Sequence, residues 1–365
     1  MTEVKPYLPQ KLPLESLQWD KFIQLIGEAN SELGRYDGIL QGIINPFVFL
    51  SPLTTQEAVL SSRIEGTEAT LEEVLDYEAL PKANRTKTED IQEVINYRQA
   101  LVYAEDYLKT KPISLNLIKG IHHRLLDSVR GRNKTRGEFR KVQNWIGRPG
   151  LPIEQASYVP PPPEVVMEYL DNFEKYVHYE EKDQLVQLAI VHAQFEIIHP
   201  FIDGNGRVGR ILIPLFLVEK KLLSAPTFYI SAYLEAHRDV YYQKLNDITQ
   251  NNDWESWIIF FLTAVIDQAK ANSEKAKAIL GLYDEMKREI AGITKSQYSI
   301  QVLDTLFERP VFSTTAFIER SRIPKASAMR ILGELRGQKV IEVLREGRGS
   351  QPTVMLFSKL MAIVG

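Results

Sequence analysis

The sequence contains no cysteine. This absence excludes disulfide bonds, a thiolate nucleophile and a zinc site built on cysteine, and it agrees with a cytoplasmic location. An excess of charge is missing too, since 44 lysines and arginines nearly balance 47 aspartates and glutamates. The net charge of −3 excludes a globally basic nucleic-acid-binding protein but not a local basic patch.

Long apolar runs are also absent. The most apolar stretches, Ile211–Val218 and Trp257–Ile266, are shorter than the ~20 residues that span a bilayer. The first residues, MTEVKPYLPQ, contain no basic segment followed by an apolar one, so they do not read as a signal peptide. We therefore expect a cytoplasmic protein that does not contact a membrane.

The composition is otherwise that of a folded protein, because 44% of the 365 residues are hydrophobic and 25% are charged. At ~150 residues per domain, the length predicts two to three domains. Prolines at positions 6, 9 and 13 predict an extended N-terminal arm. Apolar residues then recur at helical spacing to about Leu280. One interruption lies between Gly131 and Pro163, where Glu138–Ile146 reads as a short strand or hairpin.

The pattern changes near Lys295. We expect three short helices and then two strands around Gly347, which is the order of a winged helix-turn-helix domain. The expected helices are Ser299–Leu306, Ser313–Arg320 and Lys325–Gly337, and the expected strands are Val340–Leu344 and Thr353–Phe357. We place this domain at residues 295–365.

Between Glu319 and Arg348 this domain has eight basic residues and four acidic ones. That excess fits contacts between a recognition helix and wing and the phosphates of duplex DNA. The same surface also fits contacts with a protein or the packing of a dimer. Because the excess is modest, it favours the contact with a protein or the packing of a dimer, and the DNA interpretation is the alternative.

One segment, from His199 to Arg210, combines several chemical groups: HPFIDGNGRVGR. Pro200 ends the apolar helical pattern of Gln184–Ile198, because the residue before a proline disfavours helical geometry. Gly204–Gly206 then allows a tight turn, and a second helix is expected to begin inside this turn. The free N–H groups at the start of that helix form an anion-binding site.

The side chains around this turn point to chemistry on phosphates. Arg207 and Arg210 share one face of the second helix, and two guanidinium groups beside free N–H groups suit a di- or triphosphate. Asp203 is a lone carboxylate next to that site, and Mg²⁺ is commonly bound by one or two carboxylates together with phosphate oxygens. His199, when neutral, accepts a proton from an attacking hydroxyl. Each feature alone is typical of an ordinary turn or a solvated helix, but together they predict transfer of a phosphate-containing group.

The segment resembles the signature of the Fic family, H-P-F-x-x-G-N-G-R-x-x-R, at every fixed position, and Asp203 stands at its acidic position. The resemblance implies a mainly α fold with an all-helical core and a short β-hairpin flap. It also implies a protein adenylyltransferase, which transfers AMP from MgATP to a Ser, Thr or Tyr hydroxyl of a target protein. The intact second glycine and final arginine favour AMP transfer over phosphorylation.

The resemblance assigns a role to each position of the segment. His199 would be the general base, Phe201 would anchor the loop in the core, and Asp203 would hold Mg²⁺. The ATP-binding positions would be Gly204, Asn205, Gly206, Arg207, Val208, Gly209 and Arg210. Among these, the first three would cradle the α- and β-phosphates, and the last arginine would reach the γ-phosphate.

Two further regions are similar to the family. The tip of the flap would be Asn144, Trp145, Ile146 and Gly147, and it would align the target segment by strand addition. Tyr241 and Tyr242 lie in a segment that resembles the lining of the adenine pocket. Ordinary helix packing explains these two tyrosines equally well.

The segment from Ser61 to Gly66 matches the family's inhibitory motif, S/T-x-x-x-E-G/N. Ser61 and Glu65 share one face of a helix, which alone would read as a solvated face. In the family, this glutamate pairs with the second arginine of the signature and blocks the γ-phosphate, so here Glu65 would pair with Arg210. In some relatives the same glutamate positions a water that removes AMP. A deAMPylating reaction is therefore the enzymatic alternative.

The sequence thus predicts three parts: an N-terminal helical region with the inhibitory motif (1–90), a Fic catalytic core (91–290) and a winged helix (295–365). The expected small molecules are ATP as substrate and Mg²⁺ as cofactor. The expected macromolecular partners are a target protein with an exposed hydroxyl side chain, a second copy of the chain in a homodimer, and DNA or another protein at residues 295–365. The non-enzymatic alternative is a DNA-binding regulator whose core only senses the nucleotide.

Overall fold

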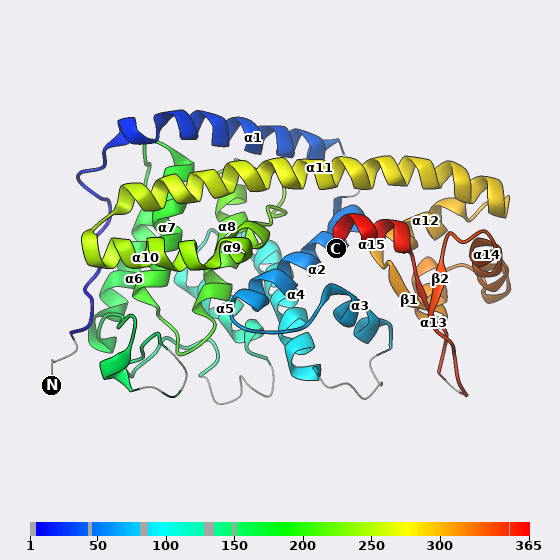
Figure 1. Ribbon diagram of the computed structural model, residues 1–365, viewed down its shortest axis with the longest axis horizontal. Helices are drawn as coiled ribbons and strands as arrows, with labels where there is room; N and C mark the ends of the chain where they lie inside the picture. The colour runs from blue at the N-terminus through cyan, green and yellow to red at the C-terminus, as the bar shows by residue number, and fades with distance from the viewer. Residues whose placement is uncertain are drawn as a thin grey trace.

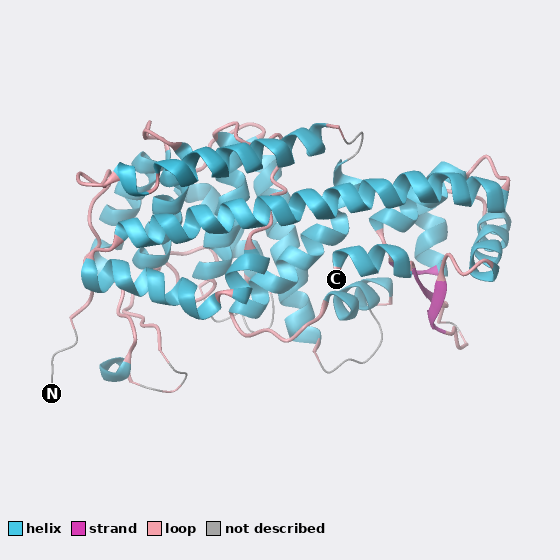
Figure 2. Ribbon diagram, turned by 45° about the horizontal axis from the view of Figure 1, so that its top comes forward, coloured by secondary structure: helices cyan, strands magenta, loops and turns pink. Residues whose placement is uncertain are grey.

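The computed structural model describes residues 5–42, 46–80, 87–127, 135–147, 150, 152–349 and 351–365. Over these residues the chain is mainly helical, as the sequence predicted, with a small sheet near one end (Figures 1 and 2). None of the described helices is both long and apolar enough to cross a membrane. Gly131, where the expected interruption begins, lies outside the described residues.

Three groups of elements follow one another along the chain. The N-terminal elements are η1 (Trp19–Lys21), α1 (Ile23–Gln41), α2 (Pro46–Ile64), α3 (Leu71–Ala79), α4 (Thr88–Leu108) and α5 (Leu115–Leu125). The central elements are η2 (Ile153–Gln155), α6 (Pro163–Val177), α7 (Gln184–Ile198), α8 (Asn205–Glu219), α9 (Ser231–Ala236), α10 (Arg238–Asn251) and α11 (Trp254–Thr294). The C-terminal elements are α12 (Ser299–Glu308), β1 (Val311–Ser313), α13 (Thr314–Ser321), α14 (Lys325–Gly337), β2 (Glu342–Arg345), β3 (Val354–Leu356) and α15 (Ser358–Val364).

α7 and α8 form the centre of the helical part. Both bury nearly every residue, which is typical of helices that other helices enclose. α1, α6, α10 and α11 pack against α7, and α4 and α5 pack against α8. Asp183 caps the start of α7 by accepting the N–H groups of Leu185 and Val186, at 2.9 Å each. The two helices have the predicted arrangement and hold the loop between them in place.

The N-terminal region wraps this centre. Its arm is extended, as the prolines predicted, and the backbone of Leu12 exchanges two hydrogen bonds of 2.8 Å with the side chain of Asn172 on α6. α1 lies along α11 (Figure 1). α2 packs against α4, α9 and α12, and it ends just before Gly66, whose φ of +98° favours glycine. α2 therefore connects the centre with the C-terminal elements.

The C-terminal elements follow the predicted order of helices and strands. α12, α13 and α14 correspond to the three expected helices, and α14 has the predicted bounds. β2 and β3 correspond to the two expected strands, but the sequence did not reveal β1, which pairs with β3 to make an antiparallel sheet of order β1-β3-β2. A strand of three residues is too short to show an alternating pattern. The assignment of this region as a winged helix stays a prediction.

The flap differs from its prediction. We expected a strand or hairpin over Glu138–Ile146, but this segment is irregular and has one isolated antiparallel bridge at its end. The cause lies in hydrogen bonds across the loop: the N–H of Arg140 donates to the carbonyl of Pro200 at 2.9 Å, and its Nε donates to the carbonyl of His199 at 3.0 Å. A backbone that is held by these contacts does not form a strand ladder.

α11 runs for 41 residues from the central elements towards the C-terminal ones. It ends at Lys295, whose φ is +45°, and the predicted boundary at residue 295 coincides with this helix end. One continuous buried core nevertheless includes residues of all three predicted parts, from Leu12 to Val364. The division into 1–90, 91–290 and 295–365 stays a prediction.

Candidate active site

His199 ends α7 and begins the loop in a left-handed conformation, with φ of +49°. Its Nδ1–H donates to the carbonyl of Glu196 at 3.3 Å, so a neutral ring carries its lone pair on Nε2. Burial lowers the pKa of His199 to about 4, which keeps the ring neutral at pH 7. A neutral imidazole with a fixed Nδ1–H is the form that accepts a proton.

The loop is held in one shape by its own side chains. Asn205 accepts the N–H of Phe201 at 2.8 Å and donates to the carbonyl of the same residue at 2.9 Å. The ring of Phe201 is fully buried and stacks on His122, with ring centroids 3.7 Å apart. Gly204, at φ of +77°, directly precedes α8, and its N–H donates to Oδ1 of Asp203 at 2.7 Å. The burial predicted for Phe201 is confirmed.

His122 supports this loop, although the sequence offered no signal for it. Its Nδ1 accepts the N–H of Gly137 at 2.8 Å, so its Nε2–H donates to the carbonyl of Asp203 at 3.1 Å. Burial lowers the pKa of His122 to about 4, which keeps this tautomer neutral. The ring therefore joins the segment that leads to the flap with the loop that carries Asp203. Nothing local distinguishes it from its neighbour His123.

Arg140 is a second supporting residue without a sequence signal. It is 3% exposed, and besides its contacts with His199 and Pro200 its Nη2 donates to the carbonyl of Pro161. Burial lowers the pKa of Arg140 to about 10, which still leaves it charged at pH 7. One guanidinium thus fixes the backbone at His199 from the side of the flap.

The predicted flap tip contacts the loop through Asn144, whose Nδ2 donates to the carbonyl of the buried loop phenylalanine at 2.9 Å. Ile146 forms the isolated bridge, with its N–H donating to the carbonyl of Tyr158 at 2.8 Å. Gly147 follows, close to the backbone of the returning chain. Trp145 and Ile146 are 43% and 41% exposed, and exposed apolar side chains suit contact with a protein. Strand addition at this tip stays a prediction.

Arg207 is fixed beside the start of α8. It is 4% exposed, and its Nη1 lies 2.8 Å from Oε2 of Glu93 on α4. Its Nη2 lies 3.6 Å from Oδ1 of Asp203. The sequence offered no signal for Glu93, because this contact joins residues 114 positions apart. Glu93 holds Arg207 at the position where the resemblance implies contact with phosphates.

The residues of the loop fit a sparse magnesium site. The side chain of Asp203 is 42% exposed, so its carboxylate is accessible. Among the described residues, no group of three or more His, Asp or Glu side chains could hold a metal ion by itself. Mg²⁺ commonly takes one or two carboxylates and completes its shell with water and substrate phosphates. Asp203 therefore fits an ion that arrives with a nucleotide.

Arg210 is enclosed, with 1% of the residue exposed. Its Nε donates to Oγ of Ser61 at 2.8 Å, and its Nη2 donates to the carbonyl of Ser61 at 2.9 Å and to Oε1 of Glu65 at 2.6 Å. The same carboxylate lies against Gly206, where an added Cβ would collide with it. The structure thus brings together the predicted pair of Glu65 and Arg210.

Both members of this pair are charged. Burial by itself would raise the pKa of Glu65, but the guanidinium groups of Arg210 and Arg207 hold it below its usual range. Burial likewise opposes the charge of Arg210, yet the carboxylate of Glu65 raises its pKa. About a third of the Glu65 side chain is exposed. The carboxylate is therefore the accessible half of a pair whose cation is buried.

Two other carboxyl groups near Arg210 differ from Glu65. Burial raises the pKa of Glu57 to about 7 and that of Glu196 to about 8. Glu57 accepts the N–H of Ser231 at 3.0 Å and its hydroxyl at 2.6 Å, which ties α2 to the start of α9. Glu196 lies beside the glycine at position 209, where an added Cβ would meet its carboxyl. The sequence offered no signal for Glu57.

The two tyrosines predicted for the adenine pocket lie on α10 in different surroundings. Tyr241 is 1% exposed, and its hydroxyl lies 3.0 Å from Nε2 of His192. Tyr242 is 41% exposed, and the guanidinium of Arg238 lies 5.8 Å from its ring centroid. Burial and then the charge of Glu65 raise the pKa of Tyr242. Tyr241 packs inside the protein, Tyr242 is open to a ligand, and the adenine role of both stays a prediction.

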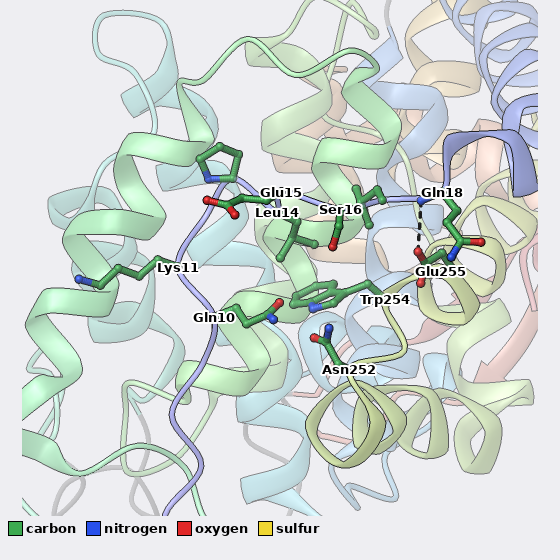
Figure 3. Close-up of a pocket in the computed structure, with 11 residues that line it drawn as sticks. Gln10, Lys11, Leu14, Glu15, Ser16, Gln18, Asn252, Trp254 and Glu255 are labelled. Atoms are coloured by element: carbon green, nitrogen blue, oxygen red, sulfur yellow. Dashed lines mark hydrogen bonds between the residues drawn. The ribbon is translucent and has the colours of Figure 1, made fainter.

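A cleft of about 480 Å³ lies elsewhere, between the N-terminal arm and the start of α11 (Figure 3). None of the described residues that line it belongs to the His199–Arg210 loop. Its one lysine, Lys11, already pairs with Glu168 at 2.6 Å, and Glu15 and Glu255 add carboxylates to the lining. An anionic nucleotide does not fit such a lining, so the loop is the candidate active site.

Comparison with known proteins matches two family models to this chain. Residues 23–106 match the model of the Fic/DOC family N-terminal region, and residues 112–217 match the model of the Fic/DOC family. Together these matches cover more than half of the chain. They include both the Ser61–Gly66 motif and the His199–Arg210 loop.

Two curated relatives match parts of the chain. A probable protein adenylyltransferase of Aquifex aeolicus is 31% identical over 198 residues, which are 52% of this chain and 56% of that protein. The protein adenylyltransferase Fic of Drosophila grimshawi is 29% identical over 163 residues, which are 42% of this chain and 31% of that protein. The chain thus spans about half the length of the first relative and less than a third of the second.

Solved structures share the fold. A Fic family protein from Desulfovibrio desulfuricans superposes with a TM-score of 0.59 at 20% identity, over 97% of this chain and 98% of that chain. A Fic-1 fragment from C. elegans superposes with a TM-score of 0.51 at 19% identity, over 71% of this chain and 73% of that chain. At these identities the likeness concerns the fold alone, and in the first case it extends over the C-terminal elements.

Proposed function

We propose, since the chain belongs to the Fic/DOC family, that it is a protein adenylyltransferase. The family membership and the geometry of the loop support transfer of AMP from MgATP to a Ser, Thr or Tyr hydroxyl of a target protein. One observation supports this most. A neutral histidine, a glycine-rich helix N-terminus and a buried arginine lie within the single loop from His199 to Arg210. The named relatives are adenylyltransferases, and their activity comes to this chain as part of the proposal.

His199 is the general base in this mechanism. Its Nδ1–H stays on the carbonyl of Glu196, so its Nε2 accepts the proton of the target hydroxyl. The hydroxyl oxygen attacks the α-phosphorus of ATP and forms a new P–O bond. The bond from that phosphorus to the bridging oxygen breaks, and pyrophosphate leaves. The protein side chain then carries AMP, and His199 passes its proton to solvent.

The phosphates bind at the start of α8. The N–H groups of Gly204–Gly206 and the side chains of Arg207 and Arg210 provide positive charge there. Asp203 would hold Mg²⁺, which would offset the charge of the phosphates. Arg140 fixes the backbone of the loop, so the histidine keeps its position relative to the helix.

Glu65 inhibits this reaction. Its carboxylate holds Arg210 and lies against Gly206, and the phosphates of ATP need both positions. An incoming γ-phosphate must displace the carboxylate and then tolerate its charge. Glu57 ties α2 to Ser231, so Glu65, which directly follows α2, is presented by an anchored helix. The wild-type chain is therefore expected to have low activity.

Mass analysis of the intact protein after incubation with MgATP tests this function. We expect Glu65→Gly to gain one or more AMP units, the wild type to gain few, and Glu65→Gly/His199→Ala to gain none. Glu68→Gly is the matched control, because it changes an exposed glutamate three residues further on and should behave as the wild type does. If Glu65→Gly transfers AMP neither to itself nor to any protein of a lysate, the transferase is contradicted.

Product analysis separates AMP transfer from its reverse. A deAMPylase would release free AMP from a modified protein, and it would need Glu65 rather than be inhibited by it. Fragmentation of the modified protein identifies the hydroxyl that is used. The homodimer and the cytoplasmic location stay predictions.

A further inference from the structure

α3 follows the inhibitory motif and lies against the C-terminal elements, where it packs on β1 (Figure 1). Oδ2 of Asp76 accepts a hydrogen bond of 2.6 Å from Nη2 of Arg345 on β2. Glu78 pairs with Arg309, which follows α12, and with Arg98 of α4 at 2.8 Å. One acidic helix thus holds two arginines of the C-terminal elements.

Charge complementarity extends beyond these pairs. Between residues 64 and 80 the chain has six acidic residues and no basic one. Residues 295–365 contain eleven basic and six acidic residues, whereas the whole chain has 44 and 47. The C-terminal elements therefore form a basic region within an otherwise acidic chain, and an acidic segment of the same chain covers part of it.

Arg345 differs from the basic residues on and around α14, because its partner carboxylate is largely buried. The side chain of Asp76 is only 12% exposed, so the pair is partly shielded from water and is weakened less by salt than an exposed pair. Basic side chains on and around α14 are exposed instead; they are Lys325, Arg330, Arg336, Lys339 and Arg348. Arg330 and Arg336 pair with Glu334 at 2.6 Å and with Glu346 at 3.4 Å, but these pairs are open to solvent. The helix α14 is thus accessible to a polyanion, whereas the arginine of β2 is held by a largely buried carboxylate of α3.

We propose that α14 and the β2–β3 hairpin form a binding surface for duplex DNA, and that α3 competes with DNA for Arg345. An exposed basic helix next to a hairpin that carries Arg345 and Arg348 suits the major groove of a duplex and the adjacent phosphates. A phosphate that reaches the hairpin meets the carboxylate of Asp76 on Arg345. DNA must displace that carboxylate to reach Arg345, so docked α3 weakens the binding of DNA. This surface is separate from the loop and does not depend on the proposed activity.

Fluorescence anisotropy of a labelled duplex of about two helical turns tests the competition with the full-length chain. Asp76→Asn keeps the shape of the side chain but removes the charge that holds Arg345, and it should tighten binding about two- to five-fold. Glu72→Gln is the matched control, because it removes the same charge from an exposed position of α3. It should change the affinity less than Asp76→Asn does. Arg345→Gln should weaken binding and lower the salt dependence by about one phosphate contact.

Tighter binding by Asp76→Asn than by Glu72→Gln, together with the smaller salt dependence of Arg345→Gln, supports the proposal. Equal affinity of the wild type and Asp76→Asn overturns it, and so does a failure of all variants to bind at about 50 mM salt. Circular dichroism verifies that each variant is folded. If Asp76→Asn is unfolded, Arg345→Gln decides alone, since an unchanged salt dependence would overturn the proposal.

Discussion

Removing the carboxylate of Glu65 should tighten the binding of MgATP. The carboxylate lies 2.6 Å from Nη2 of Arg210 and touches Gly206. ATP must displace it before its γ-phosphate reaches the arginine, whereas AMP lacks both outer phosphates. The variant Glu65→Gly removes the competitor and its charge. The affinity for MgATP should therefore rise, and the affinity for AMP should stay nearly the same.

The size of this gain follows from the burial of the pair. A charge-assisted hydrogen bond contributes about 1.5–3 kcal/mol. Arg210 is buried but about a third of the Glu65 side chain is exposed, so the lower part of that range, about 1.5–2 kcal/mol, applies. At about 1.4 kcal/mol per tenfold, the expected gain is about 10- to 30-fold. Glu65→Gln, which keeps an acceptor but not the charge, should gain less.

Isothermal titration calorimetry measures both affinities in the His199→Ala background, where no transfer is expected. Glu68→Gly in the same background is the control and should bind both ligands as its parent does. An unchanged affinity for MgATP in Glu65→Gly would refute the competition. An equal rise in the affinity for AMP would show that Glu65 does not act by competing with the γ-phosphate.

Acidification should destabilise the fold through His122. The pKa of His122 is about 4 in the folded chain, which is below the value of about 6.5 in the unfolded chain. As the pH falls below about 6.5, the imidazole of the unfolded chain therefore takes up a proton before that of the folded chain does. When the pH falls from 7 to 5, the free energy of unfolding should decrease by about 2 kcal/mol less in His122→Gln than in the wild type. Urea unfolding at both pH values measures this, and an equal decrease in the two proteins would contradict it. Phe201→Ala should lower the free energy of unfolding by about 3–5 kcal/mol, because the ring of Phe201 is fully buried. A decrease of less than about 1 kcal/mol in thermal or urea unfolding would contradict the role of Phe201 as an anchor of the loop. Duplex DNA should raise the self-modification of the wild type but not that of Glu65→Gly. DNA that binds Arg345 would release α3 from the C-terminal elements, and this release would loosen the segment that follows Glu65. Equal stimulation of both proteins by DNA, seen by intact mass, would contradict this coupling.

The helix pair around the loop was predictable because its signals are local. Pro200 ends α7, and the turn at Gly204–Gly206 begins α8, so each boundary depends on residues next to it. Ser114 begins α5 through another local contact, because its hydroxyl accepts the N–H of Leu117 at 3.3 Å. Alternation over Glu138–Ile146 failed as a strand signal, because tertiary hydrogen bonds decide the backbone of that segment.

Contacts between distant residues were not predictable from patterns. The pair of Asp76 and Arg345 joins residues 269 positions apart. The carbonyl of His199 is held by an arginine 59 positions before it, inside a segment without regular structure. The pair of Glu65 and Arg210, 145 positions apart, was expected only because of the family resemblance. Local pattern predicts which elements form, while the partners of buried charges depend on how those elements pack.

The position of the label that Glu65→Gly transfers to protein tests the central claim most directly. The variant is incubated with ATP labelled in the α-phosphate and, separately, with ATP labelled in the γ-phosphate. We expect the α-label to become bound to protein in a reaction that requires His199, and the γ-label to leave in pyrophosphate. Protein-bound γ-label would contradict AMP transfer, and α-label bound equally well by the His199→Ala variant would contradict the role of the base.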